Sequence, residues 1–189
     1  MKISALLIAL LGSFSFGAYA SDFSVVSEQS SIRFTSEAPM ETVHGQTQNI
    51  SGTVSVNPPS LAGAKASFLV EADTLKTGNR LRDRNMKDHF LETEKFSQIT
   101  FSLRGVPGSL SSGHESVLKA TGTFTIHGVT KEKNIPLSVL WDEKGGTLHV
   151  KASCPLLLSE FGIERPRILI LRLSDTVVVD VDLFLKKSL

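Results

Sequence analysis

The sequence is short of cysteine, which limits how the chain can be cross-linked. Its one cysteine, Cys154, has no partner for a disulfide within the chain. The residues around it, VKASCPLLL, are mostly apolar, so we expect a buried, unreactive thiol. A disulfide between two chains is the alternative.

The sequence also lacks an excess of charge of either sign. It has 20 Lys and Arg residues against 19 Asp and Glu, and the loss of Lys2 with an N-terminal leader would make the two numbers equal. A neutral chain has no long-range field to attract polyanions. Nucleic acid is therefore not an expected partner.

The chain has one marked apolar run outside its expected strands, at the N-terminus. Lys2 precedes the run Ile3–Phe16, and Ala18-Tyr19-Ala20 follows it with the small-x-small pattern of a cleavage site. The run is too short to span a bilayer. We expect residues 1–20 to be a secretory signal peptide and residues 21–189 to form one domain that is not membrane-spanning.

Catalytic and metal-binding patterns are missing as well. The sequence has no G-x-S-x-G turn and no glycine-rich phosphate loop. The five histidines (His44, His89, His114, His127 and His149) form no H-x-H or H-x-x-x-H pair. We expect no catalytic residues, no metal and no cofactor. His127 is interpreted as a residue at the end of a strand that bonds a turn, with contact to a ligand headgroup as the alternative.

What the sequence does contain is a repeated alternation of apolar and polar residues, which is typical of strands with one buried face. The expected strands are 32–35, 50–56, 66–73, 99–104, 118–126, 134–141, 147–153, 167–173 and 175–185. Gly145 and Gly146 predict a tight hairpin. Short connections and little helix indicate an all-β fold, an antiparallel sandwich or a barrel of about eight strands. The long apolar face of 175–185 favours the barrel.

One stretch departs from this alternation and predicts a short helix over residues 79–91. Asn79 is a candidate N-cap, and Met86 and Phe90, which are spaced i,i+4, form a small apolar contact surface. Opposite charges are also spaced i,i+4, namely Asp83 with Lys87 and Arg84 with Asp88. Because the acids are interleaved with the bases, we expect a solvated helix face in preference to a polyanion site.

Three stretches, in order along the chain, resemble the YceI family. They are GNRLRDRNMKDHFLETEKFSQITF (78–101), TGTFTIHGVTKEKNIPLSV (121–139), and SEFGIERP (159–166) followed by SDTVVVDVDLFL (174–185). The resemblance implies an extended lipocalin-like barrel in the periplasm. It also implies a ligand with a long apolar chain, such as a polyisoprenoid, a quinone or a fatty-acid derivative.

We therefore expect a binding or carrier protein and not an enzyme. The candidate residues lining the barrel are Phe34, Phe68, Val70, Met86, Phe90, Phe101, Phe124 and Trp141, and those for a polar headgroup are Asn79 and Arg82. The same lining residues would equally suit a packed core. The alternative functions are an envelope stress-related interaction protein with a filled barrel and a lipid-modifying enzyme. The expected partner is a small amphiphilic lipid or isoprenoid, and a homodimer is a further assembly that the sequence allows.

Overall fold

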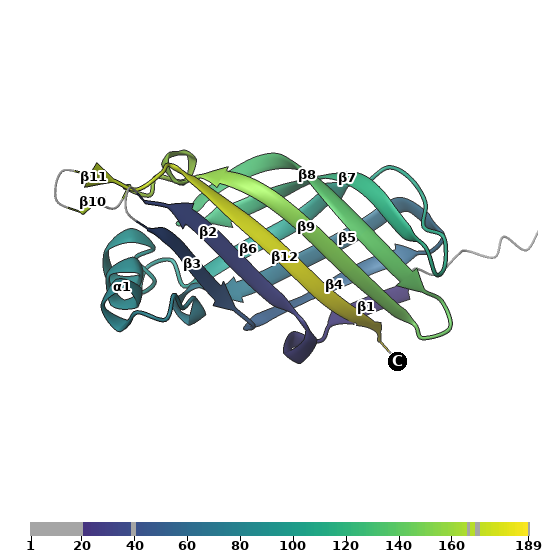
Figure 1. Cartoon of the computed structure of the whole chain (residues 1–189). Coiled ribbons are helices and arrows are strands. Elements are labelled where there is room, and N and C mark those ends of the chain that lie inside the picture. The colour runs from purple at the N-terminus through teal and green to yellow at the C-terminus, as the bar shows by residue number, and fades with distance from the viewer. Residues whose placement is uncertain (1–20, 39–40, 166, 169–170, 189) are drawn as a thin grey trace, which may run out of the picture.

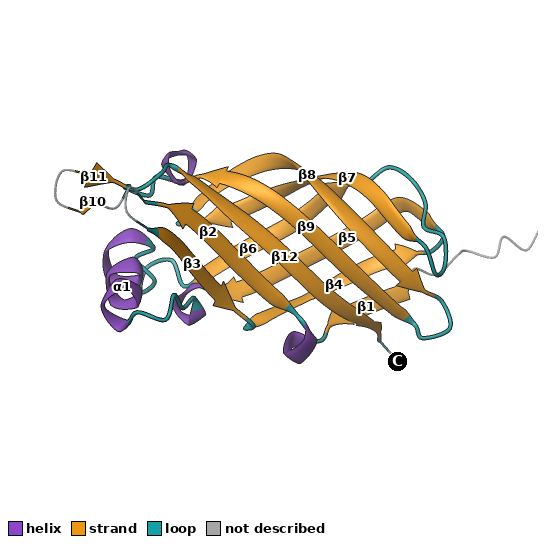
Figure 2. Ribbon diagram, viewed as in Figure 1, coloured by secondary structure: helices purple, strands orange, loops and turns teal. Residues whose placement is uncertain are grey.

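A computed structural model describes residues 21–38, 41–165, 167–168 and 171–188, so the expected signal peptide lies outside the described residues. Strands dominate the fold (Figure 2). In chain order the elements are β1 (Ser21–Val25), η1 (Ser27–Gln29), β2 (Ser31–Glu37), β3 (Thr42–Thr47), β4 (Ile50–Asn57), β5 (Ser60–Glu71), η2 (Ala72–Thr74), α1 (Arg80–Asn85), η3 (Met86–Phe90), β6 (Gln98–Gly105), β7 (Glu115–Ile126), β8 (Val129–Asp142), β9 (Thr147–Leu157), η4 (Leu158–Phe161), β10 (Arg167–Ile168), β11 (Leu171–Arg172) and β12 (Thr176–Lys187).

The strands close into an antiparallel barrel (Figure 1). The hydrogen-bonded order is β1-β4-β5-β6-β7-β8-β9-β12, and β1 pairs with β12 to complete the ring. The eight strands of this ring confirm the predicted fold class. Closure also removes the exposed strand edges that an open sheet would present.

Strands β2 and β3 extend the wall beyond β1 and β4 at the end of the barrel that carries α1 (Figure 1). β2 pairs with residues 177–182 of β12, and β1 takes over the same edge of β12 at residues 185–187. On the far side of β3, the backbones of Gln46 and Lys76 exchange two hydrogen bonds. The segment 72–97, which contains α1, is therefore attached to the edge of β3.

The apolar core forms two clusters. The first contains Phe23, Ile50, Val56, Leu61, Val70, Leu110, Val139, Trp141, Leu148, Leu183 and Leu185, and the second contains Ile126, Ile135, Cys154, Leu156, Phe161 and Ile163. The loop between β6 and β7 closes the barrel at the first cluster, where Leu110 is 3% exposed and its backbone N–H donates to the carbonyl of Pro59. We call this end the closed end and the α1 end the mouth.

Two sequence predictions about strands have different outcomes. The hairpin at Gly145 and Gly146 is confirmed, since these residues join β8 to β9. The prediction of one strand over 167–173 is wrong, because β10 and β11 pair with each other as a separate two-stranded sheet. Apolar alternation sets the two faces of a strand but does not show where the chain reverses.

The helix prediction is confirmed in position but not in its ion pairs. Helix α1 continues as the π-helical turn η3, and the two together span residues 80–90. The predicted pairs Asp83–Lys87 and Arg84–Asp88 are absent from the ion pairs of the described residues, so that prediction is wrong. Asp83 turns to the buried side of the helix instead, because Thr77 offers it two donors there.

Candidate ligand-binding site

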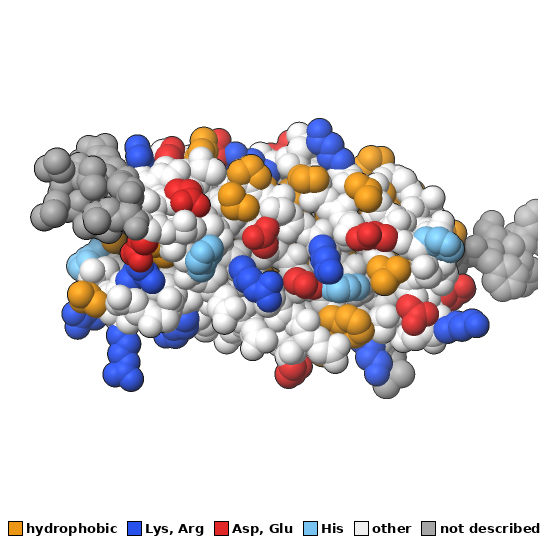
Figure 3. All heavy atoms as spheres, in the orientation of Figure 1, with side chains coloured by type: hydrophobic (Ala, Val, Ile, Leu, Met, Phe, Trp, Pro, Cys, Tyr) orange, Lys and Arg blue, Asp and Glu red, His pale blue; other side chains and the backbone are white. Residues whose placement is uncertain are grey.

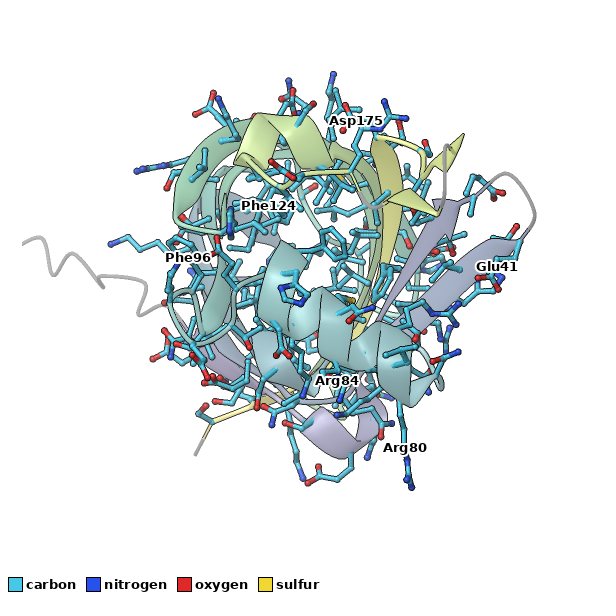
Figure 4. The ribbon with its side chains drawn as sticks, turned by 90° about the vertical axis from the view of Figure 1, so that its left-hand side faces the viewer. Glu41, Arg80, Arg84, Phe96, Phe124 and Asp175 are labelled. Atoms are coloured by element: carbon cyan, nitrogen blue, oxygen red, sulfur yellow. The ribbon has the colours of Figure 1, made fainter. Side chains whose placement is uncertain are left out.

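Segment 72–97 lies across the mouth of the barrel, as the view along the barrel shows (Figure 4). Polar contacts fasten it to β3 and to the residue before β3. They are the hydrogen bond between the hydroxyls of Thr47 and Thr74 (2.8 Å), the backbone pair of Gln46 and Lys76, and the ion pair of Arg82 Nη1 with Glu41 Oε1 (2.9 Å). These contacts depend on side chains and on two backbone hydrogen bonds, not on a continuous strand ladder.

Asp83 organises the start of this segment. Its Oδ1 accepts hydrogen bonds from the backbone N–H (2.8 Å) and the hydroxyl (2.6 Å) of Thr77, and Arg82 Nε donates to the same hydroxyl (2.9 Å). Burial acts to raise the pKa of Asp83, but the two bonds from Thr77 outweigh it and leave the pKa below the ordinary value of 3.8. The carboxylate therefore serves as an acceptor that fixes the turn before α1.

The two predicted headgroup residues already have partners in this turn. Asn79 caps α1, since its Oδ1 accepts from the backbone N–H groups of Leu81 (3.0 Å) and Arg82 (3.1 Å), as the sequence predicted. The Arg82 guanidinium binds Thr77 and Glu41. Contact of either side chain with a ligand headgroup stays a prediction.

A second polar cluster at the mouth joins three parts of the chain. His127, in the turn between β7 and β8, places Nε2 2.9 Å from Glu92 Oε2 and Nδ1 3.3 Å from the carbonyl oxygen of Phe161. The ring of Phe96 packs against His127 edge-on at 4.4 Å between centroids. We call Glu92, Phe96, His127 and Phe161 the mouth cluster.

The mouth cluster carries backbone strain. Within the described ranges, Glu92 (φ 44°) and His127 (φ 51°) are the two residues other than glycine with positive φ, and they are bonded to each other. Such conformations persist where the surrounding contacts fix them. The hydrogen bonds from Lys95 and then from His127 lower the pKa of Glu92. The carboxylate is therefore ionised in neutral solution.

His127 directly follows the last residue of β7, so its predicted position at the end of a strand is confirmed, whereas its bond to Glu92 was not predicted. The two residues are 35 positions apart. Each of the three stretches that resemble the YceI family supplies part of the mouth cluster, through Glu92 and Phe96, His127, and Phe161. The convergence of the three stretches was the available signal for this site.

Inside the barrel, three aromatic rings form a row across neighbouring strands. Phe68, Phe101 and Phe124 stand opposite one another in the registers of β5, β6 and β7. The ring centroids of Phe68 and Phe101 are 6.2 Å apart, and those of Phe101 and Phe124 are 4.9 Å apart. These distances are those of favourable aromatic pairs.

Glycines on the adjacent strands decide how these rings lie. A Cβ atom placed on Gly45, Gly52 or Gly122 would overlap the ring of Phe34, Phe68 or Phe101, respectively. Each ring therefore occupies the position that a side chain on the glycine would take. This arrangement keeps the rings against the wall.

The predicted lining residues occupy different levels of the barrel. Val70 and Trp141 are buried in the first cluster, and Phe68 packs against it. Phe90, Phe101 and Phe124 pack against the cluster nearer the mouth, Phe34 covers Gly45, and Met86 is half-buried in η3. The structure thus brings the aromatic residues of β5, β6 and β7 together, while contact of any of them with a ligand stays a prediction.

Cys154 is buried, at 5% exposure, as the sequence predicted. Burial raises the pKa of its thiol, although the nearby Lys133 ammonium acts in the opposite direction. Lys133 in turn pairs with Glu160 of η4. A neutral buried thiol of this kind contributes apolar surface to the mouth side of the core.

Among the described residues, no three or more His, Cys, Asp or Glu side chains are grouped so that they could hold a metal ion. Over the same residues, no helix combines the length and the apolar character needed to cross a membrane.

Comparison with solved structures identifies proteins with the same fold. A polyisoprenoid binding domain from Saccharophagus degradans, implicated in plant cell wall breakdown, superposes with a TM-score of 0.73 at 19% identity, over 88% of this chain and 98% of that one. BcnA of Burkholderia cenocepacia gives a TM-score of 0.73 at 18% identity, over 85% and 98%. The Campylobacter jejuni YCEI protein gives 0.64 at 20% identity, over 79% and 86%.

Comparison of sequences gives relatives of the same kind. A UPF0312 protein of Vibrio campbellii is 29% identical over 120 residues, which span 61% of each chain. A UPF0312 protein of Pseudomonas syringae pv. tomato is 26% identical over 129 residues, which cover 66% of this chain and 65% of the relative. The model of the YceI-like domain matches residues 23–185, so this chain belongs to the YceI-like domain family.

Proposed function

We propose that this protein is a periplasmic carrier that holds one long-chain amphiphile inside its barrel. The ligand class is a polyisoprenoid, a quinone or a fatty-acid derivative. The observation that carries the proposal is the half-burial of apolar residues that face inward in the middle of the barrel. Phe34, Phe68, Phe101, Phe124, Val179 and Val181 all retain accessible surface, whereas Phe23, Val56, Leu61, Leu110, Leu148 and Leu185 of the first cluster are buried.

A filled barrel would bury its central inward-facing residues most completely, because they are farthest from either end. Accessible apolar surface at that level instead favours an interior that a flexible chain can enter. The rings packed over Gly45, Gly52 and Gly122 support the same interpretation, since they cover the wall and not the axis.

Burial of apolar surface is sufficient to hold such a ligand. Each methylene group removed from water contributes about 0.8 kcal/mol, so a chain of ten or more carbons can bind tightly without any reactive group. The polar groups at the mouth, including Arg82 and Glu92, lie where the headgroup of a ligand inserted tail-first would remain. This arrangement is that of a binding site built from an apolar interior and a few polar anchors.

The relatives and the N-terminus support the ligand class and the compartment. One protein of the same fold is described as a polyisoprenoid binding domain. Residues 1–20 have the composition of a secretory signal, and the family resemblance favours the periplasm. A carrier in that compartment would shield an apolar chain from water between membranes.

A chain-length series tests the proposal. Affinity for prenyl alcohols of increasing length, measured by displacement of a fluorescent fatty acid, is expected to rise until the interior is full and then level off. Phe101→Ala, on the inner wall, is expected to weaken binding, while Phe184→Ala, on the outer face of β12, is the matched control and is expected to leave it unchanged. Affinity independent of chain length, or equal losses in the two variants, would contradict the proposal.

A further inference from the structure

The outer face of the segment across the mouth is both basic and apolar. We call Lys76, Arg80, Leu81 and Arg84 the α1 face. Leu81 is 58% exposed, and the three basic residues are also exposed. In Figure 4, Arg80 points away from the barrel, and in Figure 3 basic side chains gather at the end of the molecule that carries α1.

The acids that the sequence interleaves with these bases are partly withdrawn from the α1 face. Asp83 is buried and accepts its hydrogen bonds from Thr77, while Glu41 is paired with Arg82. Asp73 and Asp88 are exposed nearby. Their negative charges reduce but do not cancel the positive charges of Lys76, Arg80, Arg84 and Lys87. The folded segment is therefore more basic toward the solvent than its sequence suggests.

Crowding of positive charge is visible at one point of this surface. The pKa of Lys87 is lowered, first by its partial burial and then by the ammonium group of the adjacent Lys76. The carboxylates of Asp73 and Asp83 act on the pKa of Lys87 in the opposite direction. Lys76 and Lys87 are therefore neighbouring positive charges beside the α1 face.

We propose that the α1 face docks the mouth of the barrel onto a bilayer surface rich in anionic phospholipid. Arg80, Arg84 and Lys76 would bind headgroup phosphates, and Leu81, which follows Arg80 on α1, would enter the boundary of the acyl region. A soluble polyanion would satisfy the bases but would leave the exposed leucine without a partner. The combination of an exposed leucine with exposed arginines on one short helix therefore favours a membrane over a nucleic acid.

The α1 face lies beside the mouth of the barrel, so its contact with a bilayer would determine which way the mouth points. Segment 72–97 crosses the mouth, so a molecule docked in this way turns the opening of the barrel toward the bilayer (Figures 1 and 4). The backbones of β10 and β11 lie at the same end. Exchange of the ligand between barrel and membrane through this contact rests on the proposed function, whereas the contact itself does not.

Vesicle flotation tests the contact. The parent chain is expected to float with vesicles of equimolar phosphatidylglycerol and phosphatidylcholine, to bind pure phosphatidylcholine weakly, and to detach as salt is added. Arg80→Gln with Arg84→Gln is expected to weaken binding about 25-fold, at about fivefold for each charge. Leu81→Ser, which removes no charge, is expected to weaken binding several-fold. All chains compared share one N-terminus, so any contribution of residues 1–20 is common to them.

The matched control removes two charges at the closed end, with Lys144→Gln and Lys186→Gln, and is expected to bind vesicles about as the parent does. The proposal is overturned if the parent ignores phosphatidylglycerol or if the control loses as much as the arginine pair. It is also overturned if the parent binds a DNA duplex as tightly as it binds vesicles and Leu81→Ser weakens neither interaction. Ligand affinity in vesicle-free solution is measured on the same variants and is expected to stay unchanged. Vesicle binding without any ligand uptake would contradict the carrier function but not the docking surface.

Discussion

The Nε2 atom of His127 lies 2.9 Å from Oε2 of Glu92, and both residues have positive φ angles that residues other than glycine rarely adopt. The bond thus joins two strained turns, one between β7 and β8 and one after η3. Because η3 belongs to the segment that crosses the mouth, the bond couples that segment to the barrel wall.

Two replacements of His127 separate the effect of backbone strain on stability from the effect of its side-chain contacts. His127→Ala and His127→Gly both lose the contacts with Glu92, Phe96 and Phe161 and are expected to be less stable than the parent. Glycine adopts φ 51° without penalty, so His127→Gly should retain about 1 kcal/mol more unfolding free energy than His127→Ala. Urea unfolding measures the difference. Equal stability of the two variants would show that the turn is not strained.

Asp83→Ala tests what holds the start of segment 72–97. The variant loses both hydrogen bonds from Thr77, so we expect it to lose about 1–3 kcal/mol of unfolding free energy. Hydrogen exchange at the amides of residues 76–85 should also become faster. Asp88→Ala removes an exposed acid from the same segment and is the control, with an expected change within about 0.5 kcal/mol. A larger effect of Asp88→Ala would contradict this account.

Acid is expected to destabilise the fold through carboxylates with lowered pKa values. The Ser159 hydroxyl and then its backbone N–H lower the pKa of Asp175, while bonds from Lys95 and His127 lower that of Glu92. A group whose folded pKa is depressed contributes stability above its unfolded pKa and loses it as pH falls through the folded pKa. The unfolding free energy should therefore decline as the pH falls below the ordinary pKa values, which are 3.8 for Asp175 and 4.5 for Glu92.

Asp175→Asn isolates one part of this acid response. The variant cannot titrate at this position, so its unfolding free energy should be lower at neutral pH and should fall less steeply in acid than that of the parent. Denaturant titrations at a series of pH values provide both curves. Parallel curves for variant and parent would mean that Asp175 contributes nothing to the acid response.

Gly45→Ala tests whether the rings must lie against the wall. The added methyl group would overlap the Phe34 ring and push it toward the interior, at a cost of about 1–3 kcal/mol in stability. The displaced ring should also reduce the affinity for long prenyl chains. Gly105→Ala adds the same methyl group where nothing lies within 4 Å, so it is the matched control. Unchanged ligand affinity in Gly45→Ala would argue against a ligand at this level.

Local patterns in the sequence were enough to predict the strands, the barrel and the helix with its Asn79 cap, because alternation and capping act between neighbouring residues. Contacts set by the pairing of distant strands could not be predicted. The bond between Glu92 and His127 and the packing of Phe34 on Gly45 both depend on which strands are adjacent and in what register. The predicted pairing of Asp83 with Lys87 was wrong because helix spacing alone does not show that Thr77 competes for the carboxylate.

The most direct test of the carrier function is native mass spectrometry of the protein purified without detergent from its own host, followed by organic extraction. We expect a population heavier than the polypeptide by the mass of one lipid, and an extract containing a long-chain amphiphile of that mass. Gly45→Ala should carry less of it. A polypeptide mass alone, with no uptake after incubation with prenyl alcohols, quinones or fatty acids, would contradict the account.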